Sequence, residues 1–297
     1  MRSRAVIITA DDLGLWPEVN EAVMAGYDAG IISTAALRVT ARASYPAMLS
    51  AGMRPNLGVG LHLVLCDGQS ALPHRHIPNL VDRSGNFVRR PMEAAWMYRR
   101  GGKLGDELRL EIRAQIEKFL SSGLFLGFIS SHYGLHLQPA ILSIIKELAR
   151  DYPISAIRKP AGPMWRANQS IRRPAWERRV ERGLIAPVLR WGRMRSGAFL
   201  GPDRVELLCP QRPVTEHAAA QRLTGAPRGL TEFVCHPSSL AARYDGPGEL
   251  AVVTSATVRA AIAEADVEVI SYRDLAEGAW SRRAPAIEPP ATAVPER

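Results

Sequence analysis

The most constraining feature of this sequence is a repeated alternation between short apolar runs and longer segments with helical periodicity. Segments with apolar residues every three or four positions lie at residues 17–29, 106–122, 139–150, 215–223 and 254–265. The short runs, many of them β-branched, are residues 5–9, 35–40, 57–63, 126–131, 154–157, 230–235 and 267–271. Such runs are typical of parallel strands buried on both faces. The alternation predicts an α/β fold whose parallel sheet forms a (β/α) barrel-like structure.

The composition bounds what such a chain can be. It has 297 residues, 46% of them hydrophobic, which is enough for the core of one large domain. Three cysteines with no CxxC spacing predict a reducing compartment. No segment approaches the ~20 apolar residues of a membrane span, and the first apolar run is too short for the core of a signal peptide. We therefore expect a cytoplasmic protein, either free or peripheral at the inner membrane surface.

An arginine-rich segment interrupts the alternation. We predict one domain at residues 1–280 with an insertion at about residues 163–200, followed by a disordered Pro/Ala-rich tail at residues 281–297. Within the insertion, apolar side chains recur every three or four residues at Trp176, Val180, Leu184, Val188 and Trp191. This pattern favours an amphipathic helix that packs on the barrel and exposes a basic face. Contact with an anionic membrane is the alternative, and a nucleic-acid partner is not expected.

Ionisable residues stand at or just beyond the C-terminal ends of five of the predicted strands. They are Asp11 with Asp12, His62, His132, Arg158 and His236. In parallel α/β folds, active sites are built at the C-terminal ends of the strands. We therefore expect these side chains to meet at one edge of the sheet.

The residue types at these strand ends favour metal chemistry. Asp11 and Asp12 are adjacent, so their carboxylates should face different ways, one toward a metal and one toward a water; capping of the next helix is the alternative. His132 and His136 are four residues apart, and we expect them to share a face. One aspartate and two histidines can hold a divalent ion and leave positions open for substrate. His236 precedes a proline, which favours an extended backbone at the strand tip, where the imidazole can donate a proton.

At these residues the sequence resembles the YdjC-like carbohydrate deacetylases, which include chitooligosaccharide deacetylases. The similar motifs occur in the family's order at residues 8–14, 59–63, 79–87, 131–136, 156–158 and 232–237. Three positions depart from the family pattern: Leu13 replaces a phenylalanine, Gly134 a histidine and Ser238 a glycine. These departures leave the expected ligands intact and bear on the shape of the sugar pocket and the role of His136.

The resemblance implies a distorted TIM-type barrel related to NodB deacetylases, with one divalent cation, Mg or Zn, as cofactor. The implied metal ligands are Asp12, His62 and His132. The implied catalytic residues are Asp11 as general base, His236 as general acid and Arg158, which orients Asp11. We expect the substrate to contact Tyr133, His136 and Glu232. The implied reaction removes the acetyl group from an N-acetylglucosaminyl carbohydrate or glycolipid and gives a free amine and acetate.

The arginine- and tryptophan-rich insertion resembles that of the hopanoid-biosynthesis members of the family, which implies a hopanoid glycolipid as one candidate substrate. The expected partners are an N-acetylated amino sugar, a membrane or lipid-linked substrate, and a second copy of the chain in a homodimer. Two other functions remain open. One is a different metal-dependent barrel hydrolase, an amidohydrolase or a phosphoesterase, although amidohydrolases carry a His-x-His pair where this chain has Asp11 and Asp12. The other is a non-catalytic basic binder of membrane surfaces, which would leave the residues at the strand ends unexplained.

Overall fold

A parallel β-sheet forms the frame of the molecule. The structure is a computed structural model that describes residues 4–87, 90–99, 101–160, 186–210, 213–240 and 245–280. Its strands are β1 (Arg4–Leu13), β2 (Thr34–Leu37), β3 (Gly58–Leu63), β4 (Ile129–Ser131), β5 (Arg204–Leu207), β6 (Gly229–Cys235) and β7 (Glu268–Val269). The strand order is β4-β3-β2-β1-β6-β5, and β7 pairs with β1. Each of these pairings is parallel.

The row of strands curls back on itself. Beyond β4, Ile157 bridges to that strand and Ala156 bridges to Leu200, both in parallel. Shortly afterwards the N–H group of Asp203 donates to the carbonyl of Leu230 in β6, at 2.8 Å. The chain from Leu200 into β5 therefore connects the segment beside β4 with the other end of the row, and the predicted α/β barrel-like architecture is confirmed.

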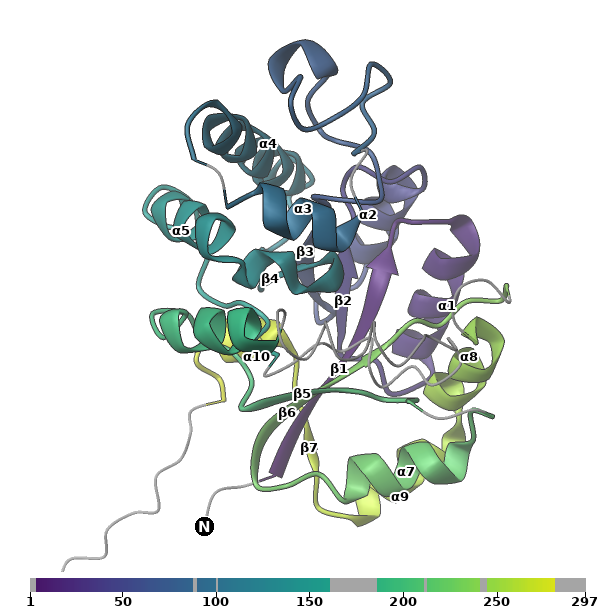
Figure 1. Ribbon diagram of the computed structural model, residues 1–297. Helices are drawn as coiled ribbons and strands as arrows, with labels where there is room; N and C mark the ends of the chain where they lie inside the picture. The colour runs from purple at the N-terminus through teal and green to yellow at the C-terminus, as the bar shows by residue number, and fades with distance from the viewer. Residues whose placement is uncertain are drawn as a thin grey trace, which may run out of the picture.

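Helices cover the outside of this sheet (Figure 1). They are α1 (Pro17–Asp28), α2 (Ser44–Gly52), α3 (Pro91–Met97), α4 (Lys103–Leu120), α5 (Pro139–Leu148), α7 (Glu216–Thr224), α8 (Gly246–Thr254), α9 (Ala256–Glu264) and α10 (Tyr272–Ala276). Two 3₁₀ segments, η1 (His74–His76) and η2 (His132–Leu137), lie in the connections. Helix α4 packs beside α5, and α7 beside α9 (Figure 1). The five predicted helices are present, with boundaries shifted by a few residues.

Helix α4 shows why the periodicity was informative. Its apolar residues Leu108, Ile112, Ile116 and Phe119 are all fully buried. Burial of each such side chain stabilises the fold by roughly 1.5–3 kcal/mol. The 3.6-residue period therefore identified the face of α4 that packs on the sheet.

Two strand predictions needed correction. The predicted strand at residues 154–157 is reduced to isolated bridges at Ala156 and Ile157. Strand β5 was not predicted, because Arg204 and Glu206 interrupt its apolar residues and the prediction relied on continuous apolar runs. Its exposed and half-buried positions are those of a strand at the end of the row, which needs apolar side chains on one face only.

Strand β1 carries an irregularity at its C-terminal end. The register with β2 shifts between Ala10 and Leu13, and Asp12 has a positive φ of 65°. A bulge of this kind redirects side chains at the end of a strand. The turn that follows is fixed by Asn20, whose Oδ1 accepts the N–H of Gly14 at 2.7 Å.

Only the C-terminal part of the predicted arginine-rich insertion lies among the described residues. Residues 186–195 are helical, as predicted, and Leu189 and Gly192 are buried. A Cβ atom at Gly192 would overlap the backbone carbonyl of Leu137, so this helix lies directly against η2. Val188 and Trp191 were predicted to lie on the buried face, but Val188 is half-buried and Trp191 is exposed. The buried face is shifted by one residue, to Leu189 and Gly192.

The remainder of the insertion at residues 163–185 and the predicted tail at residues 281–297 lie outside the described residues. In the ranges that the structure describes, no helix has both the length and the apolar character needed to cross a membrane.

Gly60 in β3 lies directly against Phe128, the residue two positions after Leu126 and just before β4. A Cβ atom there would overlap the ring of Phe128, which is itself buried and stacked on Tyr272 with 3.9 Å between ring centroids. We expect Gly60→Ala to lower the free energy of unfolding by about 1–3 kcal/mol, the usual cost of overpacking a core. Urea unfolding monitored by circular dichroism measures this change. Gly52→Ala is the control, because its Cβ atom would meet open space; equal unfolding midpoints for the two variants would contradict the prediction.

Candidate active site

Three of the predicted ligands converge at the C-terminal ends of the strands. Asp12, His62 and His132 each offer one ligand atom, and these atoms all lie within 4.8 Å of one another. Oδ1 of Asp12 is 3.9 Å from Nε2 of His62. The two imidazole rings stand edge to face, with 6.0 Å between centroids. Strands β1 and β3 and the segment after β4 therefore deliver three buried donors to one point.

The state of His62 fits a metal ligand. Its Nδ1 lies 2.9 Å from Oγ of Ser130, while its buried Nε2 has no hydrogen-bond partner among the described residues. Burial lowers the pKa of His62 to about 3, so the ring is neutral near pH 7. A metal ligand must be a neutral imidazole, and a hydrogen bond at one ring nitrogen fixes the direction of the other. With Asp12 and His132, this donor set fits a divalent cation.

Arg38 helps to keep Asp12 ionised. Burial raises the pKa of Asp12, but the charge of Arg38 and the three nearby histidines together outweigh burial and hold that pKa well below its usual range. Nη1 of Arg38 is 3.3 Å from Oδ1 of Asp12, and Nη2 donates to the carbonyl of Asp67 at 3.2 Å. Arg38 was not predicted as a site residue. It directly follows β2, but the predicted strand ran to residue 40, so the strand-end rule missed it.

Asp11 pairs with Arg158, whereas Asp12 contacts Arg38. Two nitrogens of the guanidinium donate to the two carboxylate oxygens of Asp11, both at 2.7 Å. Burial raises the pKa of Asp11, but the charge and hydrogen bonds of Arg158, together with the nearby His62 and His236, more than offset this, so the pKa is lowered. Bidentate pairs of this kind fix geometry as well as charge. Asp11 is therefore a carboxylate with a set orientation.

Glu232 lies beneath this pair and not in the cleft. Nε of Arg158 donates to Oε1 of Glu232 at 2.9 Å. Thr9 donates to the same oxygen and Tyr272 to Oε2, both at 2.8 Å. The side chain of Glu232 is fully buried. Glu232 was expected to contact substrate, but here its carboxylate supports Arg158 from below.

The prediction that His132 and His136 share a face is wrong. Tyr133 and Gly134 between them have left-handed backbones, with φ of 58° and 72°. His132 therefore turns toward Asp12, whereas His136 is fully buried and its Nε2 lies 2.8 Å from the carbonyl oxygen of Arg158. Tyr133 packs edge-on against the ring of His132, with 4.2 Å between centroids. Neither Tyr133 nor His136 is among the residues that line the cleft described next.

A cleft of about 750 Å³ opens over these residues, and Asp11, Asp12, His132 and His236 line it. His236 is half-buried, and its backbone N–H donates to the buried carboxylate of Glu249 at 2.6 Å. Glu249 was not predicted, because it lies on α8, and the glycines and proline at the start of α8 do not indicate a helix. The structure thus places the imidazole of His236 in the lining of the same cleft as the carboxylates of Asp11 and Asp12.

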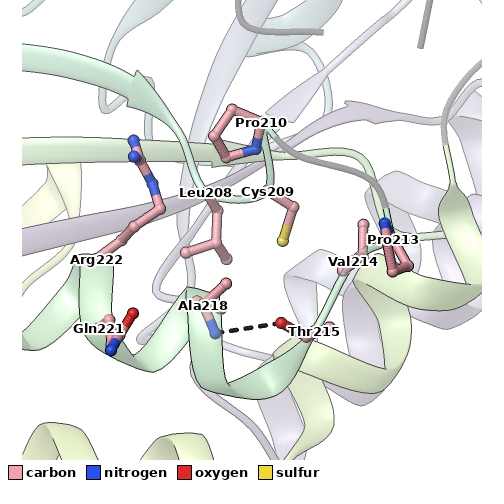
Figure 2. A pocket seen from close by; sticks show the side chains of 10 residues that line it. Leu208, Cys209, Pro210, Pro213, Val214, Thr215, Ala218, Gln221 and Arg222 are labelled. Carbon is pink, nitrogen blue, oxygen red and sulfur yellow. Dashed lines mark hydrogen bonds between the residues drawn. The ribbon is translucent and has the colours of Figure 1, made fainter. Parts of the chain in front are cut away.

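A second hollow, of about 190 Å³, lies between the chain after β5 and α7 (Figure 2). Its lining includes Leu208, Cys209 and Arg222, and Thr215 caps α7 beside it by accepting the N–H of Ala218. None of the predicted site residues lines this hollow. The larger cleft is therefore the candidate active site.

The sequence is similar to those of known deacetylases. A carbohydrate deacetylase of Geobacillus stearothermophilus is 35% identical over 157 residues, which are 52% of this chain and 60% of that protein. A chitooligosaccharide deacetylase of Serratia marcescens is 27% identical over 282 residues, which are 92% of this chain and 99% of that protein. The matched part thus spans little more than half the length of the first of these relatives.

Among solved structures, a protein from Enterococcus faecalis V583 described as a cellobiose-phosphate cleavage protein has a TM-score of 0.68 at 24% identity. The match covers 92% of this chain and 99% of that one, which is a likeness in fold. The sequence profile of the family described as YdjC-like protein matches residues 5–264. Since that match takes in most of the chain, this protein belongs to the YdjC-like family.

Proposed function

We propose that this chain is a metal-dependent hydrolase that removes the acetyl group from an N-acetylglucosaminyl substrate. The observation that carries the proposal is the convergence of Asp12, His62 and His132, since Asp12 and His132 line the same cleft as Asp11. The relatives described as carbohydrate deacetylases support a sugar as substrate. Acetate and a free amino sugar are the products.

A divalent cation, magnesium or zinc, held by Asp12, His62 and His132 would polarise the acetyl carbonyl and acidify water. Asp11 accepts the proton of the attacking water as general base. Its carboxylate is ready for this step, because Arg158 holds both oxygens and lowers the pKa of Asp11, which keeps the group deprotonated near neutral pH. Arg158 is itself held in place at two points. Its guanidinium donates to Glu232, and its backbone carbonyl contacts Nε2 of His136.

His236 protonates the departing nitrogen as general acid. It lines the same cleft as Asp11, and the proline at position 237 restricts its backbone to extended geometry. The hydrogen bond from its N–H to Glu249 fixes the main chain at this point. A base and an acid that line one cleft suit the hydrolysis of an amide, whose nitrogen leaves only when it is protonated.

Acetate release from soluble and lipid-linked N-acetylglucosaminyl compounds, including a hopanoid glycolipid, tests the proposal. We expect one acetate per free amine formed, loss of activity with a chelator, and recovery when the divalent cation is restored. Aryl phosphates, assayed in parallel, test the phosphoesterase alternative. The proposal fails if the metal-loaded protein releases acetate from none of the sugars, or if a chelator that strips the cation leaves the rate unchanged.

A further inference from the structure

We propose that Trp16 and Arg42 form a platform for a second sugar ring of the substrate, the ring joined to the acetylated one. This inference rests on the proposed function and names a specificity determinant for it. Both residues line the cleft that holds Asp11 and His132. Neither takes part in the chemistry described above.

Trp16 offers an open aromatic surface inside that cleft. Its side chain is 43% exposed, although exposure of so large an apolar group to water is unfavourable. The guanidinium of Arg42 lies 5.9 Å from the centroid of the indole ring, within the range of a cation–π contact. The pair therefore presents a flat apolar surface next to hydrogen-bond donors.

The backbone of this pair is held in place before any ligand binds. The carbonyl of Trp16 accepts the N–H of Asn20 in the first turn of α1, at 3.1 Å. The side chain of Asn20 donates to the carbonyl of Ala43 at 2.9 Å, and the N–H of Ala43 donates to the carbonyl of Gly14, also at 2.9 Å. One asparagine thus ties the segment of Trp16 to the segment of Arg42. A preorganised surface loses little conformational entropy when a ligand binds.

The surroundings of Trp16 suit a sugar ring. One face of a pyranose presents C–H groups that pack on an aromatic ring, and its hydroxyl groups need partners at the edge. Glu18, Gln69 and Asn86 line the same cleft and offer such partners. A lipid chain on this surface would desolvate those polar groups without pairing them, which is costly. At about 750 Å³ the cleft is also larger than a single monosaccharide requires.

The test compares acetate release from N-acetylglucosamine and from di-N-acetylchitobiose by the metal-loaded full chain. We expect Trp16→Ala to lower the ratio of the two kcat/KM values, disaccharide over monosaccharide, by about tenfold, mainly through KM. Trp16→Phe should retain most of the preference, because it keeps an aromatic face. Trp96→Ala is the matched control: Trp96 is 63% exposed and lies 4.8 Å from Arg99, but it does not line the cleft.

An unchanged ratio in Trp16→Ala overturns the platform while leaving the proposed function intact. The platform is also overturned if Trp16→Ala lowers acetate release only from lipid-linked N-acetylglucosamine, since the surface would then hold an apolar aglycone. If the wild-type protein releases acetate from none of the sugars, lipid-linked ones included, the proposed function fails, and calorimetric titration of the monosaccharide and the disaccharide tests the platform separately. Tenfold weaker binding of the disaccharide by Trp16→Ala then supports the platform, and equal binding overturns it.

Discussion

Asp11→Asn is expected to lower the kcat of acetate release by about 10³-fold while the cation remains bound. The amide has nearly the shape of the carboxylate but cannot accept a proton near neutral pH. The proposed ligands Asp12, His62 and His132 are untouched by this change, and Arg158 keeps its contact with Glu232. Steady-state kinetics and metal analysis by mass spectrometry on the same preparation separate the loss of the base from the loss of the cation.

Asp28→Asn is the matched control for this variant. Asp28 also forms a bidentate pair with an arginine, since Nε and Nη2 of Arg54 donate to its two oxygens at 2.7 and 2.5 Å. That pair is on the surface, where such ion pairs contribute little to stability. Wild-type kcat in Asp28→Asn with a large loss in Asp11→Asn assigns the effect to the base. An Asp11→Asn enzyme with full activity removes Asp11 from that role.

The candidate site could be predicted from the sequence because parallel strands impose a direction. A polar residue directly after a buried apolar run lies at the C-terminal edge of the sheet, whatever its distance along the chain. The strand ends predicted that Asp12, His62 and His132 lie at one edge of the sheet with the other strand-end residues, and the family resemblance singled out these three as ligands. The structure groups the same three side chains. The strand-end prediction depends only on where a strand ends, and it failed where that end was misplaced, as at Arg38.

Contacts beneath the site could not be predicted in the same way. The spacing of His132 and His136 indicated a shared face only for a regular backbone, and the left-handed residues Tyr133 and Gly134 break that regularity. Tyrosine is not a residue type that favours a positive φ, so the residue at position 133 does not predict the kink. Similarly, Glu232 stands on β6, which is buried on both faces. The sequence pattern therefore does not indicate which face of β6 contacts Arg158.

The fold was more predictable at its centre than at its edge. Strands β1, β3 and β6 are almost entirely buried, so both faces must be apolar and the run itself marks the strand. Strand β5 needs apolar residues on one face only, and α8 begins with Gly246, Pro247 and Gly248, which are typical of a turn. The local sequence of β5 and α8 specifies their secondary structure only weakly, and these elements depend on packing against the rest of the fold.

His62→Ala is expected to abolish tight binding of the divalent cation, and activity with it. The variant removes a neutral, buried imidazole whose Nε2 has no other partner in the described part of the chain. Ser130→Ala should have a graded effect, since Oγ of Ser130 contacts Nδ1 of His62 at 2.9 Å and only orients the ring. Loss of such an orienting contact typically weakens metal affinity about 10–100-fold, and removal of the ligand itself should cost more.

Calorimetric titration of the metal-free protein with zinc or magnesium measures this series directly, without an activity assay. His74→Ala is the matched control, because Nδ1 of His74 likewise lies 2.9 Å from an oxygen, the carbonyl of Val81, but His74 is not in the metal-ligand cluster. Thermal unfolding of each variant shows whether the fold is retained, so weaker binding is not mistaken for unfolding. The order expected for cation affinity is wild type and His74→Ala, then Ser130→Ala, then His62→Ala. Wild-type affinity in folded His62→Ala would show that the cation binds elsewhere. It would contradict the proposal that Asp12, His62 and His132 hold the cation.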